Sequence, residues 1–114
     1  MALPQEQSGT INTVMTNYCA NKVPVEYQNQ MRVKFKIRGN SVTLYEERPA
    51  FFRENEWVDI SVAQFRYNPE NKNWTLYCAD RNSRWHVYYD IDPNPDFNRL
   101  LDEVEEDPTG IFWG

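Results

Sequence analysis

The chain has 114 residues, of which 40% are hydrophobic and 15% aromatic, and it carries a net charge of −5. This length suits one domain, expected over residues 1–114, with a core that needs neither a metal ion nor a disulfide. No window approaches the roughly 18 apolar residues of a membrane span, and residues 1–10 lack the basic and apolar regions of a secretory signal. We therefore expect a cytoplasmic protein that does not bind membranes.

The first expected element is a helix over about 9–21. Its apolar side chains recur at helical spacing and form one face, made by Ile11, Val14, Met15, Tyr18 and Cys19. Ser8 or Thr10 can cap its first turn. Pro24 disfavours continuation of the helix. Residues 24–30 are a turn or a second helical piece, and the sequence leaves both readings open.

Alternating apolar and basic residues then predict a strand over about 31–38. Gly39-Asn40 suits a two-residue hairpin turn into a second strand over about 41–48. This turn places Ile37 opposite Val42, Phe35 opposite Leu44, and Arg32 opposite Glu47 as an ion pair. Glu46 and Arg48 fall on the apolar side of the second strand. We expect this strand to leave the sheet there, so that both side chains lie at a rim; a buried ion pair is the alternative.

Three further strands are expected over about 57–67, 74–80 and 85–91. The first changes its apolar parity, which a bulge near Ser61 would explain while keeping Val58 and Ile60 on the core side. A four-residue loop places Phe65 opposite Leu76 and Tyr67 opposite Trp74. Inward residues of the last two strands are expected to be Trp74, Leu76 and Cys78, then Trp85, Val87, Tyr89 and Ile91.

A second helix is expected over about 95–106, with Asn94 as its N-cap and Pro95 in its first turn. The apolar tail, residues 108–114, is expected to dock into the core, where Trp113 and Trp85 would share one core or pocket. The fold class is therefore α+β: an antiparallel β-meander of about five strands, flanked by an N-terminal and a C-terminal helix.

A basic stripe is the clearest candidate binding surface. Period-two spacing places the heads of Arg32, Lys34, Lys36 and Arg38 on one sheet face. Tyr45 is expected on the same face, with Tyr77 and Tyr88 outward on later strands. Basic side chains beside aromatic rings can bind single-stranded nucleic acid, although a solvated sheet face has the same pattern. Arg81 and Arg84 are further candidate binding residues.

The charge distribution bears on the kind of partner. Residues 1–43 carry a net charge of +3, from five bases and two acids, and the remainder carries −8. An acidic chain argues against a general nucleic-acid coat protein, and we expect a protein partner rather than nucleic acid. A homodimer through an exposed sheet edge is an alternative.

His86 is the only histidine and the centre of the candidate catalytic group. With Asp80 or Asp90 it could act as a general base, and Arg81 or Arg84 could hold an anion. An exposed, non-catalytic histidine is the competing reading. A weak metal site from His86 with Asp90 and Asp92 lacks the usual ligand number, so neither metal nor cofactor is expected.

The sequence does not select one function. Cys19 and Cys78 are interpreted as reduced, small apolar residues; a disulfide between them or a catalytic thiol is the alternative. The familiar nucleotide, metalloprotease and hydrolase motifs are missing. We therefore expect a non-enzymatic binding or adaptor domain; a small hydrolase-like enzyme using His86 and a single-stranded nucleic-acid binder are the alternatives.

Several segments resemble a family of small bacterial proteins catalogued as a domain of unknown function, number three-zero-two-four. The segments are residues 38–46, 48–49, 74–77, 80–82, 84–86 and 107–114. The resemblance covers nearly the whole chain, and the ending is its most specific part. Cys78 departs from the family pattern. The resemblance implies a bacterial single-domain protein without an assigned activity, and it supplies no catalytic residues.

Overall fold

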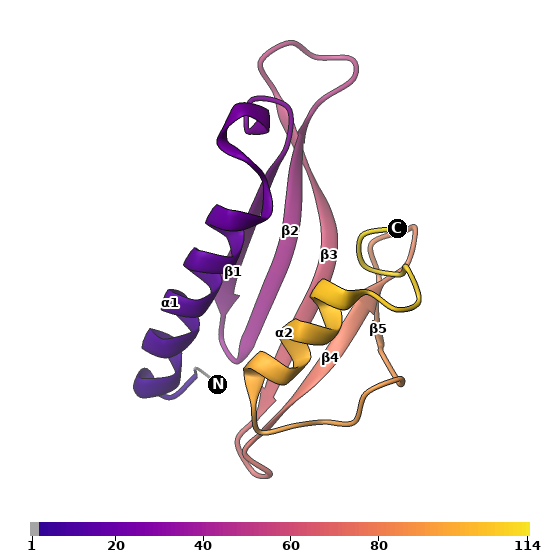
Figure 1. The fold of residues 1–114 in the computed structure, drawn as a ribbon. Helices are drawn as coiled ribbons and strands as arrows, with labels where there is room; N and C mark the ends of the chain where they lie inside the picture. The colour runs from indigo at the N-terminus through magenta and orange to yellow at the C-terminus, as the bar shows by residue number, and fades with distance from the viewer. Residues whose placement is uncertain (1–2) are drawn as a thin grey trace.

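The computed structural model describes residues 3–114. Its five strands form one antiparallel sheet in the order β1-β2-β3-β4-β5, with a helix near each end of the chain (Figure 1). The elements are α1 (Gln5–Lys22), the short 3-10 helix η1 (Val25–Tyr27), β1 (Arg32–Arg38), β2 (Ser41–Pro49), β3 (Trp57–Asn68), β4 (Asn73–Ala79), β5 (Trp85–Val87) and α2 (Phe97–Glu106). This confirms the α+β meander. No helix in the described range is long and apolar enough to cross a membrane.

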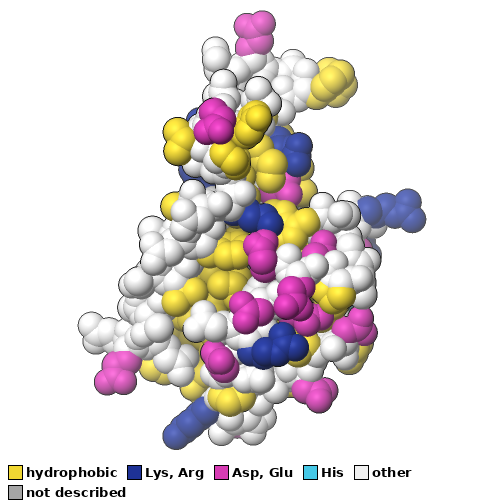
Figure 2. Space-filling view, viewed as in Figure 1, with side chains coloured by type: hydrophobic (Ala, Val, Ile, Leu, Met, Phe, Trp, Pro, Cys, Tyr) yellow, Lys and Arg dark blue, Asp and Glu magenta, His cyan; other side chains and the backbone are white. Residues whose placement is uncertain are grey.

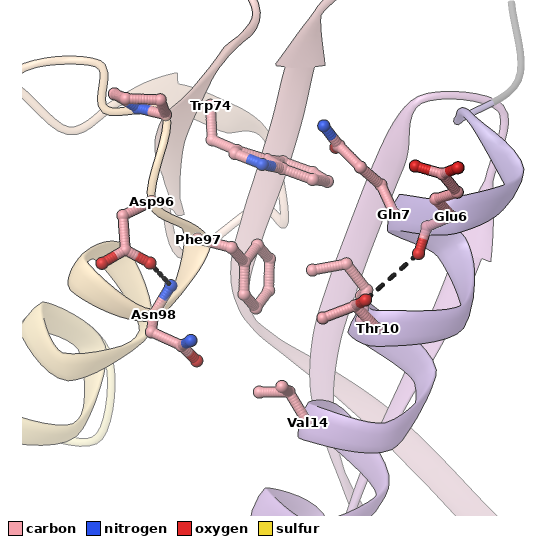
Figure 3. A pocket seen from close by; sticks show the side chains of 10 residues that line it. Glu6, Gln7, Thr10, Val14, Trp74, Asp96, Phe97 and Asn98 are labelled. Carbon is pink, nitrogen blue, oxygen red and sulfur yellow. Dashed lines mark hydrogen bonds between the residues drawn. The ribbon is translucent and has the colours of Figure 1, made fainter.

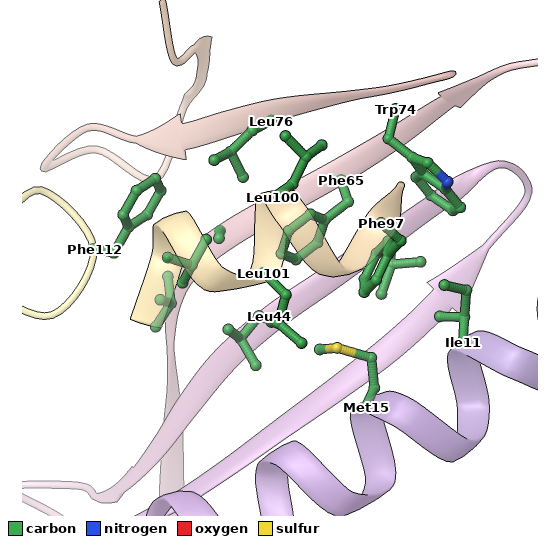
Figure 4. Packing of buried hydrophobic residues seen from close by; sticks show 14 of the residues in the cluster. Ile11, Met15, Leu44, Phe65, Trp74, Leu76, Phe97, Leu100, Leu101 and Phe112 are labelled. Atoms are coloured by element: carbon green, nitrogen blue, oxygen red, sulfur yellow. The ribbon is translucent and has the colours of Figure 1, made fainter. Parts of the chain in front are cut away.

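Both α-helices pack on the same face of the sheet, and the hydrophobic core lies between the two layers (Figures 1 and 4). Alternate strand residues enter this core, and the most buried are Val42, Leu44, Phe65, Trp74 and Leu76, each at most 2% exposed. Phe97 of α2 lies 4.6 Å from the Phe65 ring and 5.0 Å from the Trp74 ring. Met15 of α1 and Leu100 of α2 close the core and are fully buried. Neither helix covers the opposite face of the sheet.

Helix α1 begins earlier than expected, at Gln5 rather than near residue 9. Its N-cap position is Pro4, which makes no side-chain capping bond. The expected start was wrong because it assumed a polar cap at Ser8 or Thr10. Thr10 lies inside the helix, and its hydroxyl donates to the Glu6 carbonyl oxygen at 3.1 Å. After α1, the chain forms η1, which is the second of the two readings left open for residues 24–30.

The register of the two predicted hairpins is confirmed. Ile37 pairs with Val42 and Phe35 with Leu44 between β1 and β2. Phe65 pairs with Leu76 and Tyr67 with Trp74 between β3 and β4. In both hairpins, apolar residues of the two strands meet on the core face, which fixes the register.

The bulge in β3 is confirmed, but part of the core-side face that it creates is not buried. Leu44 pairs with Ala63 and Tyr45 with Ser61, so Val62 is the extra residue, and both Val62 and Ala63 are buried. Val58 and Ile60 lie on the core side of the sheet, as expected, opposite Arg48 and Glu46, but they are 46% and 44% exposed. The β2–β3 hairpin projects past the helices as an arm (Figure 1), so this part of β3 lacks a covering layer.

Strand β2 does not leave the sheet where expected. It stays paired with β3 as far as Pro49, and Glu46 is only 7% exposed. Arg48 donates from Nε to Oε2 of Glu46 at 2.8 Å, while half of the Arg48 side chain remains exposed. A buried carboxylate with a partly solvated partner therefore replaces the expected pair at a rim.

Strand β5 is shorter than the expected 85–91 and faces the other way. Ala79 pairs with Trp85 and Tyr77 with Val87, so Trp85 and Val87 lie on the helix-free face and not in the core. The turn takes residues 80–84, one more than expected, because the Asp80 carboxylate accepts the backbone N–H groups of Asn82 and Arg84. A shift of one residue reverses every side chain of a strand.

The segment after β5 is also reversed relative to the prediction. Tyr88, expected to point outward, is only 5% exposed, and Tyr89, expected inward, is 85% exposed. The backbone N–H of Tyr88 donates to the Leu76 carbonyl oxygen at 2.9 Å. Ile91 packs against the core as expected.

Helix α2 begins two residues later than expected, with Asp96 as its N-cap. The Asp96 carboxylate accepts the Asn98 backbone N–H at 3.0 Å. Asn94, expected to cap the helix, instead exchanges two backbone hydrogen bonds with Trp74, at 2.8 and 3.0 Å. Asn94 therefore protects the free edge of β4.

The C-terminal tail docks into the core, as expected. Phe112 is 6% exposed, and its ring lies 5.0 Å from that of Tyr88. The Asp107 carboxylate accepts the backbone N–H groups of Phe112 and Trp113 at 3.0 and 2.8 Å. Trp113 packs against the core, whereas Trp85 lies on the opposite face, so the idea that they share one core is wrong.

Candidate binding face

The helix-free side of the sheet gathers most of the candidate binding residues. We call it the outer face. Strand pairing places on it Arg32, Lys34, Lys36 and Arg38 of β1, Tyr45 and Glu47 of β2, Trp57, Asp59 and Arg66 of β3, Tyr77 of β4, and Trp85 of β5. Side chains alternate along a strand, so this set points away from the core. The basic stripe and Tyr45 therefore share one continuous surface with rings from the other strands.

Cations stack on three of the four rings of the outer face. The guanidinium carbon of Arg66 lies 3.8 Å from the centre of the Tyr77 ring, and that of Arg32 lies 3.9 Å from the Trp57 ring. Lys36 Nζ lies 5.4 Å from the Tyr45 ring. These distances lie within the range of cation–π attraction.

Arg32 does not make the ion pair expected from its register. It lies opposite Glu47 in the sheet, but its side chain stacks on Trp57 and donates from Nε to the Gln28 carbonyl oxygen at 3.0 Å. Lys34 takes its place, with Nζ 3.2 Å from the Glu47 carboxylate. The planar guanidinium gains more from an indole ring than a Lys ammonium does, which accounts for the exchange.

Polar side chains fix the centre of the outer face. Gln64 donates to the Thr43 hydroxyl at 2.9 Å and accepts from Arg66 Nε at 2.7 Å. Arg66 is thereby held over Tyr77 by a second contact. This part of the surface is ordered before any ligand arrives, which lowers the entropic cost of binding.

The phenol of Tyr45 remains neutral. Partial burial, together with the carboxylates of Asp59 and Glu47, raises its pKa above the ordinary value. Tyr45 therefore presents an uncharged ring and hydroxyl at every physiological pH.

Arg81 and Arg84 lie in the turn between β4 and β5 and are both exposed. The Asp80 backbone N–H donates to the Arg84 carbonyl oxygen at 2.9 Å, which closes the turn. This turn leads directly into Trp85, so the two arginines lie at the β4–β5 corner of the sheet.

His86 meets Asp80, one of its two candidate partners. His86 Nε2 lies 2.8 Å from Asp80 Oδ2. The hydrogen bond from His86, followed by that from the Arg84 backbone, holds the pKa of Asp80 below its ordinary value. Asp90 lies beyond the end of β5 and is exposed. Within residues 3–114, no three His, Cys, Asp or Glu side chains converge as metal ligands would.

The histidine pair is open to water. The His86 side chain is 59% exposed, and the Asp80 carboxylate also orders the turn through two backbone N–H groups. The arrangement explains the conformation of residues 80–86 without a chemical role. A general base gains its effect from a site that positions substrate and excludes water, and the open surface here does neither.

Charge is segregated between the two faces of the molecule. The outer face carries five bases and two acids, a net charge of +3; because the whole chain carries −5, the rest carries −8. Figure 2, which views the helix side, shows acidic side chains gathered over α2. The acids of α2 are Asp102, Glu103, Glu105 and Glu106. The net charge of the chain therefore describes neither face.

A hollow of about 350 Å³ lies between α1 and the start of α2 (Figure 3). Val14, Trp74 and Phe97 contribute apolar walls, and Gln7, Thr10 and Asp96 line it with polar groups. The hollow lies on the helix side, so the sheet separates it from the outer face. Further along the same groove, Lys22 bridges the two helices by pairing with Glu105 and lies 4.4 Å from the Trp113 ring.

Both cysteines are free thiols, as expected. Burial raises the pKa of Cys19 to about 11 and also raises that of Cys78. A thiol with a raised pKa holds little of the nucleophilic thiolate at neutral pH. The buried thiol of Cys78 contacts the His86 carbonyl oxygen at 3.6 Å.

Sequence reasoning missed four members of the outer face: Trp57, Asp59, Arg66 and Trp85. Arg66 lies between Phe65 and Tyr67, two residues expected inward, so strand alternation was a sufficient signal for it. The bulge expected near Ser61, with Val58 on the core side, already implied an outward Trp57, so strand alternation was a sufficient signal for it too. Trp85 required the length of the β4–β5 turn.

Comparison with protein families gives one match. The family model DUF3024, described as a domain of unknown function, matches residues 3–114. The chain belongs to this family. No curated protein and no solved structure matches it. DUF3024 membership confirms the resemblance seen in the sequence, and its description assigns no activity.

Proposed function

We propose that this DUF3024 protein is a non-enzymatic binding domain that contacts an anionic macromolecule through its outer face. The observation that supports this most strongly is the pairing of cations with aromatic rings on the face that neither helix covers. An arginine provides charge and an aromatic ring provides contact area, and both residue types are enriched in binding surfaces. Lys36 and Arg38 are exposed, and Lys36 lies 5.4 Å from the Tyr45 ring.

A binding role accounts for the polar groups better than catalysis does. The His86–Asp80 pair lies on an open surface, and Asp80 also holds a turn. The high thiol pKa of Cys19 disfavours a covalent role for this residue. Ligand recognition requires only the preformed outer face.

Cytoplasmic location, bacterial origin and a single domain over 1–114 are part of the proposal. Two free thiols, one of them buried and the other half-buried, suit a reducing compartment. Both helices and strands β1 to β4 contribute residues to one core, and β5 pairs with β4, which is the arrangement of a single folding unit. The bacterial origin rests on the sequence resemblance.

The test is affinity capture from a bacterial lysate with two charge-matched variants. K36E/R38E reverses two exposed cations of the outer face, and R53E/K72E reverses two exposed cations in turns away from it. Both changes alter the net charge equally, and circular dichroism checks that both variants fold. We expect wild type and R53E/K72E to retain the same partner and K36E/R38E to lose it.

Equal capture by all three proteins would contradict the proposal. It would mean that the ligand uses another surface, such as the groove between α1 and α2. The proteins and the nucleic acids in each eluate are quantified separately, so that the class of partner is read from the same experiment.

A further inference from the structure

The outer face has features that point to one class of anionic ligand. We propose that it binds single-stranded nucleic acid, an inference that rests on the proposed function and names the ligand. Proteins that bind single strands combine a positive track for the backbone with rings on which bases stack. The outer face provides both.

The stacking surfaces lie on different strands. Tyr45 is on β2 and Tyr77 on β4, with β3 between them. Neighbouring strands lie about 4.8 Å apart, and residues about 3.4 Å apart along a strand. Tyr77 shares a row with Thr43, two residues from Tyr45, so Tyr45 and Tyr77 lie roughly 12 Å apart on the sheet. Bases that are splayed along a single strand can reach both rings, whereas the bases of a duplex are already stacked on one another.

Arginine adds to the stacking surface instead of blocking it. Arg66 lies over Tyr77 at 3.8 Å and is held there by Gln64. A guanidinium plane itself accepts a stacked base and also pairs with phosphate. The Arg66–Tyr77 pair therefore offers one planar, positively charged platform at the centre of the sheet.

The cations also define where the backbone of the ligand runs. The two acids, Glu47 and Asp59, face each other at the arm end of the sheet, and Lys34 pairs with Glu47. Lys36 and Arg38 lie toward the other end, and Arg38 is in the β1 position next to the hairpin turn. The backbone is thus expected to run from the β1 edge toward Arg66, away from the arm.

The acidic helix side does not cancel this attraction. A helix with its side chains is about 10–12 Å across, so the acids on the outside of α2 lie farther than that from the outer face. The Debye length is about 10 Å at 0.1 M salt, so their repulsion is largely screened there. The earlier expectation of a protein partner used the net charge of −5, which averages two faces of opposite sign.

The test is a titration of a labelled dT oligonucleotide and its RNA counterpart, each of about 12 nucleotides, into the full chain at several salt concentrations. Each phosphate contact with a single strand contributes about −0.7 to the slope of log K against log salt. K36E/R38E is expected to make this slope shallower by about 1.4, the contribution of two contacts. R53E/K72E is expected to keep the wild-type slope.

A second pair of variants tests stacking. Y45L/Y77L keeps every charge and removes two rings, and we expect it to weaken binding at least about tenfold with an unchanged slope. F51L/F52L removes two rings that are 91% and 90% exposed on the arm and is expected to bind as wild type does. A duplex of the same length is expected to bind more weakly than the single strand.

Two results would overturn the inference. The first is no binding of either oligonucleotide at low salt by a folded protein. The second is equal affinity for single strand and duplex together with no effect of Y45L/Y77L, which would indicate attraction to any polyanion. If a protein is captured by wild type and lost by K36E/R38E while no oligonucleotide binds, this inference fails and the proposed function stands.

Discussion

At the scale of single residues, a buried hydrogen bond joins the side chains of Tyr88 and Glu103. The Tyr88 hydroxyl donates to Glu103 Oε2 at 2.9 Å, and Glu103 is only 7% exposed. Arg99 Nη1 lies 3.6 Å from the other carboxylate oxygen. A buried carboxylate is costly unless it is hydrogen-bonded, so this contact ties the segment after β5 to α2.

Replacing Tyr88 by Phe tests this contact. We expect Y88F to lower the free energy of unfolding by about 1–3 kcal/mol, because Glu103 stays buried without its donor. Urea unfolding measures the difference. Y89F is the matched control, since Tyr89 is 85% exposed and its change is expected to have no effect. A Y88F protein as stable as Y89F would mean that the contact contributes nothing.

The same tyrosine predicts a pH dependence. Burial, followed by the hydrogen bond to Glu103, raises the pKa of Tyr88 to about 12, against about 10 in an unfolded chain. Between these two pH values the unfolded state binds fewer protons than the folded state. The contribution of Tyr88 to the free energy of unfolding is therefore fully present below about pH 10 and decreases as the pH rises from about 10 to 12. We expect wild type to lose more free energy of unfolding over this window than Y88F. Parallel losses would contradict the assignment.

At the scale of elements, the C-terminal tail is a structural part of the fold. Phe112 fills a site beside Tyr88 and is 6% exposed, whereas its neighbour Ile111 is 47% exposed. We expect F112A to cost about 3–5 kcal/mol, the usual range for a buried Phe, and I111A about 0.5 kcal/mol. Chemical denaturation of both variants gives the comparison. Equal, small losses would show that the tail is not part of the core.

The β2–β3 arm is the opposite case. Its loop carries Phe51 and Phe52, whose rings lie 4.9 Å apart and are 91% and 90% exposed. Neither ring belongs to the core, so F51S/F52S is expected to leave the melting temperature unchanged and the stability within about 0.5 kcal/mol. A clear loss of stability would place these rings against the body of the protein.

The hairpins show how much of the fold the sequence determines. Gly39 takes a φ of 57° in the β1–β2 turn, a conformation that glycine adopts without strain. A two-residue turn leaves one register, and the apolar residues of both strands then agree with it. The whole β1–β2 pairing, and with it the outward position of the basic stripe, could therefore be predicted.

The β4–β5 turn shows why the rest could not. The sequence pattern is consistent with Asp80 at the end of a strand or at the start of a turn. Its carboxylate accepts two backbone N–H groups, and these hydrogen bonds make it a turn residue. Ser83 takes a φ of 61° within the turn, which the sequence does not indicate. One residue of turn length reversed β5, and this hid Trp85 as a member of the outer face.

At the scale of the whole molecule, the fold separates two surfaces of opposite charge. A one-layer sheet with both helices on one side leaves a broad face free, which carries five bases and two acids, whereas α2 on the other side carries four acids. Antiparallel sheets tolerate such a solvent-facing side. This segregation lets an acidic chain present a basic, aromatic surface to a ligand.

The four tryptophans test the central claim most directly, because they report on different parts of the molecule. Trp57 and Trp85 lie on the outer face, Trp74 is 2% exposed in the core, and Trp113 lies on the helix side. The measurement is the NMR shift of the four indole N–H groups during titration with a dT oligonucleotide. We predict a shift at Trp85 and none at Trp74 and Trp113; Trp57, which lies at the arm end beyond Glu47 and Asp59, is expected to shift less than Trp85. Shifts at Trp113, with Trp85 unmoved, would contradict the account.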